Sequence, residues 1–412
     1  MMKPRPTSTQ PWRRLGGPAV FLRALVRSFE PLRRRRALPA ALLCAAALLA
    51  LAAPPGSSYA GASRPMGVLP AVHRVDVAAL TVIDLGTLPG GNYSYAWSVN
   101  DRGQVVGLSA TASGSEHAFL WTAQGGMQDL GAAAGGVYTL ARGINNLGQV
   151  VGDRNTPPIG PAQAVLWSRQ GALQMLGTLP GQKDSVAYSI NDAGQTVGGS
   201  NSASGMEGAA LWTSQGTVRS LGALPGDSES WAMDINSLGQ VVGLSFTPTG
   251  PDHPFLWTAQ AGMRDLGALP GGGSADAYAI NDLGQVVGMS ALGAPADHAF
   301  LWSAGSAMRD LGTLPADADS VAYGINRLGQ VVGASQGPAG ANHPFLWTAQ
   351  GGMQALGSLP GAAGGIAFSV NGAGLIAGRC TTASGAEHAC VWMPSGASSS
   401  LRQATYLETT AR

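Results

Sequence analysis

The fold is decided by a stretch that reads AYAINDLGQVVG at residues 277–288, followed by HAFLW at 298–302 and MRDLG at 308–312. Two short runs rich in strand formers flank Asn281-Asp282-Leu283-Gly284. Asn and Asp hydrogen-bond to nearby backbone in turns, and glycine supplies the positive φ that a tight hairpin needs. The first stretch is therefore predicted to be a β-hairpin. The HAFLW and MRDLG segments, joined by a short turn, are predicted to form a second one.

This unit recurs along the chain with a period of about 45 residues. The GQVVG motif or a variant of it begins at Gly103, Gly148, Gly194, Gly239, Gly284, Gly329 and Gly374. One tryptophan stands at the same place in each copy, as Trp121, Trp167, Trp212, Trp257, Trp302, Trp347 and Trp392. Self-similarity at this period, with four short strands per copy and no helical periodicity, is typical of propeller blades. The sequence predicts an all-β, seven-bladed β-propeller. Its tryptophans are expected to be core residues against the neighbouring sheet, with an exposed ladder for sugar stacking as the alternative.

The order of strands predicts two different faces and a closed ring. Both tight turns of a copy fall on one face, here called the turn face, and both longer loops on the other, the loop face. A crossover between blades needs a long loop, and the Leu-Pro-Gly segments at 88–90, 179–181 and 269–271 fit that role. If the Leu-Pro-Gly loop separates the blades, the seventh copy lacks its fourth strand. Residues 82–86 have the sequence of such a fourth strand but stand alone before the first copy. Their pairing is predicted to close the ring and remove a free sheet edge, with an open array as the alternative.

The first 60 residues differ in kind from the rest. A basic segment ending at Arg36 precedes an apolar run over 37–53 and a small-residue site ending at Ala60. This is the arrangement of a secretory signal peptide, with cleavage predicted after Ala60; an uncleaved membrane anchor is the alternative. We expect a linker over 61–79, the propeller over 80–395 and a flexible tail over 396–412. The protein is predicted to be secreted, either periplasmic or extracellular.

Removal of the signal peptide leaves an acidic chain. Residues 1–60 hold ten of the 24 basic residues and one of the 23 acidic residues, which leaves 14 against 22. No basic face is left for a nucleic-acid partner, and no apolar stretch after residue 60 is long enough for stable membrane insertion. We expect a monomer. Cys380 and Cys390 are predicted to form a disulfide between neighbouring strands, with two free thiols as the alternative.

The combined motifs resemble those of the bacterial extracellular HAF-repeat family. His117-Ala118-Phe119 and His298-Ala299-Phe300 carry the triplet that names the family, each downstream of an Asn-x-x-Gly-Gln-Val-Val-Gly segment. The resemblance covers about residues 82–392, although Gln163 and Gly208 replace the histidine in the second and third copies. It implies an exported repeat protein and supplies no catalytic residues.

The repeat histidines raise the question of a metal site; they are His117, His253, His298, His343 and His388. Ring symmetry would hold equivalent positions too far apart for a shared zinc, whose ligands lie about 2.1 Å from the ion. We expect instead that each makes a structural hydrogen bond to the adjacent loop. The turn at 281–284 lacks the full spacing of a calcium loop. No metal and no cofactor are predicted.

Acidic residues of the loop face are the candidate binding residues: Glu116, Asp184, Glu207, Asp227, Glu229, Asp252, Asp276, Asp297, Asp317, Asp319 and Glu387. Such a ring could focus negative potential toward a basic peptide or divalent cations, whereas ordinary solvated acids are the alternative. No catalytic residue is predicted, because no Ser-His-Asp order, phosphate loop or metalloprotease spacing occurs. We predict an exported, non-catalytic module that binds an unknown protein or glycan through its variable loops. A propeller glycosidase or lyase using loop carboxylates, or a purely structural envelope component, are the alternatives.

Overall fold

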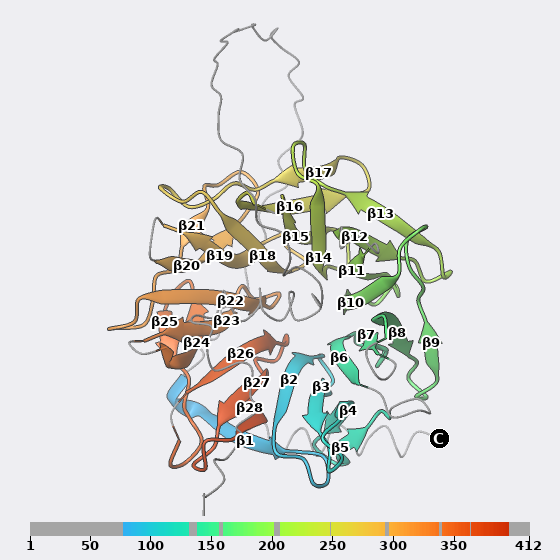
Figure 1. Cartoon of the computed structure of the whole chain (residues 1–412). Coiled ribbons are helices and arrows are strands. Elements are labelled where there is room, and N and C mark those ends of the chain that lie inside the picture. Colours follow the sequence, from blue (N-terminus) through green and yellow to red (C-terminus); the bar gives the residue numbers. More distant parts are fainter. Residues whose placement is uncertain are drawn as a thin grey trace, which may run out of the picture.

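The computed structural model describes residues 77–131, 138–155, 160–201, 207–247, 249–292, 296–337, 340–362 and 364–394. These residues form seven four-stranded antiparallel sheets around one axis, which is a seven-bladed β-propeller (Figure 1). The predicted fold class is confirmed. The signal peptide, most of the linker and the tail predicted from the sequence lie outside the described residues. Within the described ranges, no helix is long and apolar enough to cross a membrane.

In the first six blades each blade is one repeat, and its strands run outward from the axis in sequence order; the seventh blade takes β1 as its outermost strand. The innermost strands are β2 (Ser94–Val99), β6 (Thr139–Ile144), β10 (Asp184–Ile190), β14 (Glu229–Ile235), β18 (Ala275–Ile280), β22 (Asp319–Ile325) and β26 (Gly365–Val370). The second strands are β3 (Val105–Ala110), β7 (Val150–Arg154), β11 (Thr196–Asn201), β15 (Val241–Phe246), β19 (Val286–Ala291), β23 (Val331–Gln336) and β27 (Ile376–Thr381). The third strands are β4 (Glu116–Thr122), β8 (Gln163–Trp167), β12 (Glu207–Trp212), β16 (Asp252–Thr258), β20 (Asp297–Trp302), β24 (Asn342–Thr348) and β28 (Glu387–Pro394). The outermost strands are β5 (Gly126–Asp129), β9 (Leu173–Met175), β13 (Val218–Gly222), β17 (Gly262–Asp265), β21 (Arg309–Asp310), β25 (Gly352–Ala355) and β1 (Leu80–Gly86).

Strand β1 supplies the fourth strand of the seventh blade and so closes the ring, as the sequence predicts. It follows a short 3-10 turn, Val77–Ala79, and pairs antiparallel with β28, with Ile83 opposite Val391. The sheet order is β1-β28-β27-β26. In Figure 1 the blue β1 lies beside the red strands of the seventh blade. The two ends of the array therefore share one sheet, and the edge of β28 is covered.

The two glycines of the GQVVG motif have separate structural reasons. The first has positive φ in every copy, for example 71° at Gly284, because it closes the tight turn between the first two strands. The second faces a β-bulge in the innermost strand. A Cβ on Gly288 would lie 1.8 Å from the carbonyl oxygen of Asp276, and one on Gly107 would lie 1.8 Å from that of Tyr95. Only glycine allows this approach, so the motif encodes both a turn and a bulge.

A closed belt of asparagines joins the blades on the turn face. Its members are Asn100, Asn145, Asn191, Asn236, Asn281, Asn326 and Asn371, all buried. Each Nδ2 donates to the backbone carbonyl of the next asparagine, and Asn371 returns to Asn100 at 2.9 Å. Each Oδ1 also accepts two backbone N–H groups of its own turn; those of Asn281 come from Leu283 and Gln285, both at 3.0 Å. The spacing of the turn, repeated in all seven copies, thus serves contacts between blades as well as the turn itself.

We expect Asn281→Ala to lower the free energy of unfolding by about 2–3 kcal/mol, because it leaves several buried partners unsatisfied. The lost bonds include those to Asn326 O at 3.0 Å and to Gln285 Oε1 at 2.8 Å. Chemical denaturation measures the change. Leu283→Ala is the matched control, since that side chain is 71% exposed in the same turn and should change stability by under about 0.5 kcal/mol. Equal effects of the two substitutions would contradict a bridging role for the belt.

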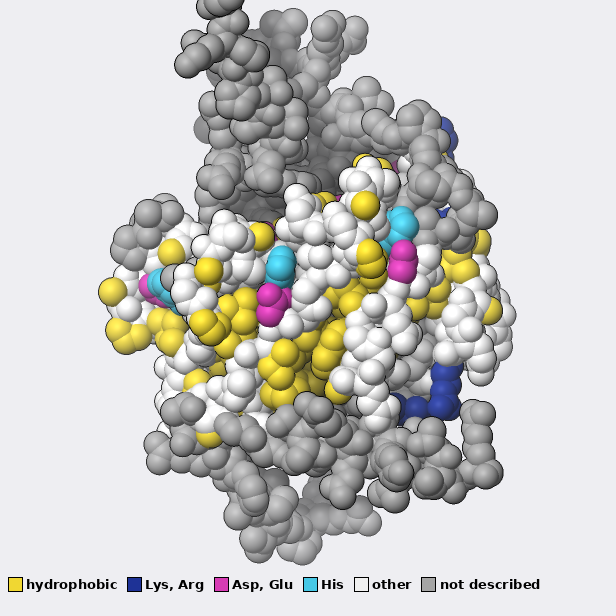
Figure 2. All heavy atoms as spheres, turned by 90° about the horizontal axis from the view of Figure 1, so that it is seen from below, with side chains coloured by type: hydrophobic (Ala, Val, Ile, Leu, Met, Phe, Trp, Pro, Cys, Tyr) yellow, Lys and Arg dark blue, Asp and Glu magenta, His cyan; other side chains and the backbone are white. Residues whose placement is uncertain are grey.

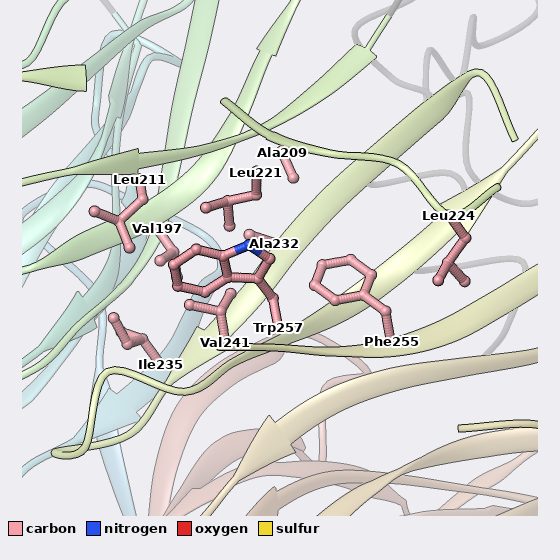
Figure 3. Close-up of a cluster of buried hydrophobic side chains, with 10 residues drawn as sticks. All are labelled: Val197, Ala209, Leu211, Leu221, Leu224, Ala232, Ile235, Val241, Phe255 and Trp257. Atoms are coloured by element: carbon pink, nitrogen blue, oxygen red, sulfur yellow. The ribbon is translucent and has the colours of Figure 1, made fainter. Parts of the chain in front are cut away.

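The hydrophobic core lies between neighbouring blades, with one tryptophan in each interface. Trp257 on β16 packs among Val197 and Leu211 of the preceding blade and Val241 and Phe255 of its own (Figure 3). The other repeat tryptophans are buried as well, except Trp121, which is partly buried. Arginines of the preceding outermost strand cover some of these rings; Arg219 lies 4.7 Å from the Trp257 ring centroid. The tryptophans therefore occupy core positions and do not form an exposed ladder.

Cys380 on β27 and Cys390 on β28 form a disulfide, with Cα atoms 5.9 Å apart. Both cysteines are buried in the interface between the sixth and seventh blades, in a cluster that includes Val82 of β1. The bridge therefore links the second and third strands of the one blade that the chain closes with its N-terminal strand.

Candidate functional site at the loop end of the axis

A collar of seven side chains, one per blade, surrounds the axis. Its members are Trp97, Arg142, Tyr188, Met233, Tyr278, Tyr323 and Phe368, the extra residues at the bulges of the innermost strands. They contact one another across blades: the Tyr278 and Tyr323 rings are 5.8 Å apart, and the Tyr323 and Phe368 rings 5.4 Å. Because a bulge re-aims the side chain of its extra residue, the repeat directs these groups toward the axis.

Arg142 is the one charged member of the collar and is held on three sides. Its guanidinium carbon lies 5.1 Å from the ring centroids of both Trp97 and Tyr188. Its Nε donates to Asp153 on β7 at 2.5 Å, and both side chains are almost fully buried. Burial raises the pKa of Asp153, and the Arg142 charge opposes that shift. The attraction of Asp153 also raises the pKa of Arg142 against the effect of burial, so the guanidinium stays charged.

A second group of polar and aromatic side chains lies at the loop end of the innermost strands, and we call it the loop-end cluster: Tyr93, Tyr95, Glu116, Tyr138, Arg379 and Glu387. Tyr93 donates to Glu116 Oε1 at 2.6 Å, and Tyr95 donates to Glu387 Oε2 at 2.7 Å. Arg379 forms an ion pair with Glu387, and its guanidinium carbon lies 5.4 Å from the Tyr95 ring centroid. The Tyr93 and Tyr95 rings are 5.8 Å apart. The cluster thus joins the seventh, first and second blades.

Burial controls the protonation of this cluster. It raises the pKa of Tyr93 and of Tyr95, and the hydrogen bond to Glu116 raises that of Tyr93 further. Both hydroxyls therefore stay protonated at neutral pH and act as donors. Burial also raises the pKa of Glu116, partly offset by the Tyr93 hydrogen bond. Glu387 instead forms an ion pair with Arg379. Two glutamates at equivalent positions of neighbouring blades therefore have contrasting environments.

Of the acids singled out from the sequence whose side chains the structure describes, only Glu116 and Glu387 join this cluster. Most of the others are engaged within the protein. Asp276 is buried and accepts the Tyr278 hydroxyl at 2.8 Å, and Asp319 accepts the backbone N–H of Asp297 at 3.0 Å. Glu229 is also buried, Asp184 is partly buried at the start of β10, and the N–H of Asp252 donates to Ser274 at 3.1 Å. The side chain of Glu207 lies outside the described part of the chain.

The repeat histidines pair with aspartates. Nδ1 of His253 and His343 lies 3.0 and 2.9 Å from Asp227 and Asp317 of the crossover loops. In the other copies the partner is on the outermost strand: Asp129 for His117, Asp310 for His298 and Asp84 for His388, at 2.8 to 2.9 Å. The loop position that holds Asp227 and Asp317 is Gly91, Gly272 and Ala362 in those copies, so the histidine turns outward. Figure 2 shows histidines beside acidic side chains on the outer wall. Among the described residues, no group of three or more potential ligands could hold a metal.

One partly buried carboxylate bridges three blades beside the collar. Asp234 of β14 accepts the Ser189 hydroxyl at 2.6 Å and the backbone N–H groups of Ile235 and Ile280, both at 2.9 Å. Burial raises its pKa to about 6, although these hydrogen bonds oppose the shift. Copies in other blades have serine, alanine or glycine at this position, so the carboxylate is specific to the fourth blade.

Because the folded pKa of Asp234 exceeds the unfolded value, its contribution to stability is full below pH 3.8 and is lost as the pH rises through about 6. The quantity to follow is the free energy of unfolding of the wild type minus that of Asp234→Ser. We expect this difference to fall by about 3 kcal/mol between pH 3.8 and pH 7, since one pKa unit corresponds to about 1.4 kcal/mol. Chemical denaturation across this range measures the difference, in which other titrating groups cancel. A difference that is flat with pH would show that the hydrogen bonds hold the pKa near its usual range.

Comparisons with known proteins bear on the fold alone. No family model matches the chain, and no curated protein matches its sequence. Among solved structures it is similar to puromycin hydrolase (12% identity, TM-score 0.51, covering 72% of this chain and 50% of that one). It is also similar to a streptogramin B lyase (13%, 0.49, 76% and 98%) and to TolB from Acinetobacter baumannii (10%, 0.44, 61% and 62%). The chain thus spans half the length of puromycin hydrolase and under two thirds of TolB. At these identities a propeller architecture is the shared feature, and the resemblance to the HAF-repeat family stays a prediction.

Proposed function

We propose that this protein is an exported, non-catalytic binding module that presents its loop face to a protein or glycan. The observation that supports this best is the loop-end cluster, where the repeat is broken in three adjacent blades. At the position of Arg379, other blades carry Leu108, Asp153, Gly199, Leu244, Met289 and Ala334. Charged and aromatic side chains gathered by a rigid ring, at the end where the variable loops emerge, are typical of a recognition site.

Retention on a panel of immobilised glycans and envelope extracts tests this function, with product analysis of each bound ligand. We expect saturable retention without breakdown. Tyr95→Phe should weaken binding by about tenfold, because it removes the hydroxyl that donates to Glu387 at 2.7 Å and leaves the ring. Leu238→Ala, on the turn face, is the control that should bind like the wild type. Retention that is insensitive to Tyr95→Phe would place binding elsewhere.

The second candidate is a glycosidase or lyase, and the two contrasting glutamates favour it. Glu116, with its raised pKa, suits a general acid, and Glu387, ion-paired with Arg379, suits a carboxylate base or nucleophile. Breakdown of a panel ligand that disappears in Glu116→Gln would establish this reading. Binding without breakdown, in both the wild type and that variant, would leave the non-catalytic module.

A further inference from the structure

Two buried arginines define a recurring arrangement around the loop half of the axis. Each guanidinium lies over at least one aromatic face and pairs with a carboxylate from a neighbouring strand. Arg142 lies over the Trp97 and Tyr188 rings and pairs with Asp153. Arg379 lies over the Tyr95 ring and pairs with Glu387. Aromatic faces and a carboxylate together suit a cation, because the ring quadrupole and the negative charge attract it from different sides.

The first blade also brings a carboxylate and aromatic rings together, but no arginine or lysine that the structure describes is in direct contact with that carboxylate. Glu116 accepts the Tyr93 hydroxyl, and Tyr138, which is 48% exposed, directly precedes β6 at the same loop end. No lysine or arginine of the described ranges forms an ion pair with Glu116.

The repeat explains this difference between blades. Glu116 and Glu387 are the first residues of the third strand in their blades. Each pairs in register with the end of the second strand, opposite Ala110 and Thr381. Two residues before Thr381 is Arg379, and two residues before Ala110 is Leu108. The first blade therefore keeps the carboxylate and replaces the arginine with an apolar residue.

We propose that Glu116, with the rings of Tyr93 and Tyr138, binds the ammonium group of an organic cation at the loop end of the axis. The charges favour a cation. Arg142 forms an ion pair with Asp153 and Arg379 with Glu387, whereas Glu116 interacts with the Arg142 charge only from a distance. Two arginines against three carboxylates leave one negative charge in surplus. This inference rests on the proposed function, since it assigns a ligand chemistry to the same face. A quaternary ammonium, a lysine side chain and an amino sugar share the required group.

Titration calorimetry with choline and with its neutral isostere 3,3-dimethylbutan-1-ol tests the inference, because the two differ only in the charge at the central atom. We expect choline to bind at least about tenfold more tightly than the alcohol. Nα-acetyl-lysine amide and glucosamine are titrated in the same way. Whichever of these two or choline binds most tightly identifies the kind of ammonium group that the site prefers. Equal affinity for choline and the alcohol, or no binding of any of the three cations, would overturn the inference.

Three variants locate the site. Glu116→Gln keeps the shape and should weaken cation binding by about tenfold or more, and Tyr138→Leu by about threefold to tenfold. Leu108→Arg should abolish binding, because it supplies an internal cation at the position that Arg379 has in the seventh blade. Asp310→Asn, on the outermost strand of the fifth blade, is the control. It removes one negative charge, as Glu116→Gln does, and should leave cation binding unchanged. If Leu108→Arg fails to fold, the other variants still decide the question. Unchanged affinity in Glu116→Gln would overturn the assignment.

The pH dependence gives a readout that a merely structural role of Glu116 would not produce. Burial raises the pKa of Glu116, the Tyr93 hydrogen bond and the Arg142 charge oppose that shift, and the Asp153 charge adds to it. Because the carboxyl must ionise to hold a cation, choline binding should weaken as the pH falls and should release protons near that pKa. Calorimetry in two buffers with different ionisation enthalpies measures the release.

Failure of this inference can be told from failure of the proposed function. A panel ligand that binds through Tyr95, is not displaced by choline and binds Glu116→Gln normally would leave the function standing and remove the cation site. If no panel ligand is retained and choline also fails to bind, both are wrong.

Discussion

A chain that begins at Thr87, and so lacks β1, is expected to lose cooperative folding, whereas one that begins at Val77 should fold like the full protein. Removing β1 takes away the outermost strand of the seventh blade and exposes the edge of β28. It also removes Leu80 and Val82 from one interblade cluster and Ile83 and Leu85 from the next. At about 1 kcal/mol for each half-buried aliphatic side chain, with the strand pairing in addition, the loss is about 5 kcal/mol or more. That is comparable to the whole stability of a typical domain.

Thermal unfolding followed by circular dichroism, with light scattering for aggregation, distinguishes the two chains. A synthetic peptide covering residues 78–88 supplies a control, because a strand that closes the ring through backbone pairing should restore folding when it is added in trans. A cooperative transition of the shorter chain at the temperature of the longer one would mean that the first and seventh blades hold together without β1. The contacts that remain between them include the asparagine belt, the bond from Ala389 N–H to Ser94 at 2.8 Å, the Tyr95–Glu387 hydrogen bond and the buried side chains of their shared apolar cluster.

Much of the fold could be predicted because the repeat carries it. The tight turns, the third-strand tryptophans and the fourth strand that stands alone at 82–86 are local patterns, and copying them seven times removes the ambiguity of any single copy. The predicted division of each repeat into four strands, the crossover loop and the ring closure all agree with the structure. The disulfide joins two cysteines on neighbouring strands, where hairpin geometry places them.

The axial collar was not predicted, although a signal for it is present. Regular alternation along the innermost strand gives no reason to single out its fourth or fifth residue, because a bulge changes the alternation there. A comparison of the copies position by position would have shown a large side chain after the same small residue each time, with Arg142 as the single charged member. The close approach to the second glycine of the GQVVG motif is the physical mark of that bulge.

The loop-end cluster was only partly predicted, because its contacts depend on distances between blades. Glu116 and Glu387 were among eleven candidate acids, and the repeat also places Asp252 and Asp297 at the same position. What sets Glu387 apart is the Tyr95 hydroxyl, 292 residues away in sequence and 2.7 Å away across the closed ring. Such pairs follow from the closure of the propeller and become visible only when the first and last blades are neighbours.

The buried pair of Arg142 and Asp153 gives the second large expected effect. We expect Arg142→Met to lower the free energy of unfolding by about 3–5 kcal/mol, because it leaves the Asp153 carboxylate buried without its partner. Asp153→Leu should cost a similar amount, since the arginine would keep only its two aromatic contacts. Both replacements occur naturally at the equivalent positions of other blades, as Met233 and Leu244. The double variant should therefore pack well and recover to within about 1 kcal/mol of the wild type.

Chemical denaturation of the four proteins at pH 7 gives the coupling energy, which we expect to be about 3 kcal/mol or more. Arg264→Met is the matched control: that arginine also stacks on a tryptophan, at 5.7 Å from the Trp302 ring, but is exposed on β17, and its loss should cost under about 1 kcal/mol. In Arg142→Met the unpaired Asp153 has a folded pKa above its unfolded value, so this variant should regain stability relative to wild type as the pH falls. Additive single and double effects, with no such recovery at low pH, would show that the two side chains are stabilised separately and that the aromatic faces alone hold the arginine.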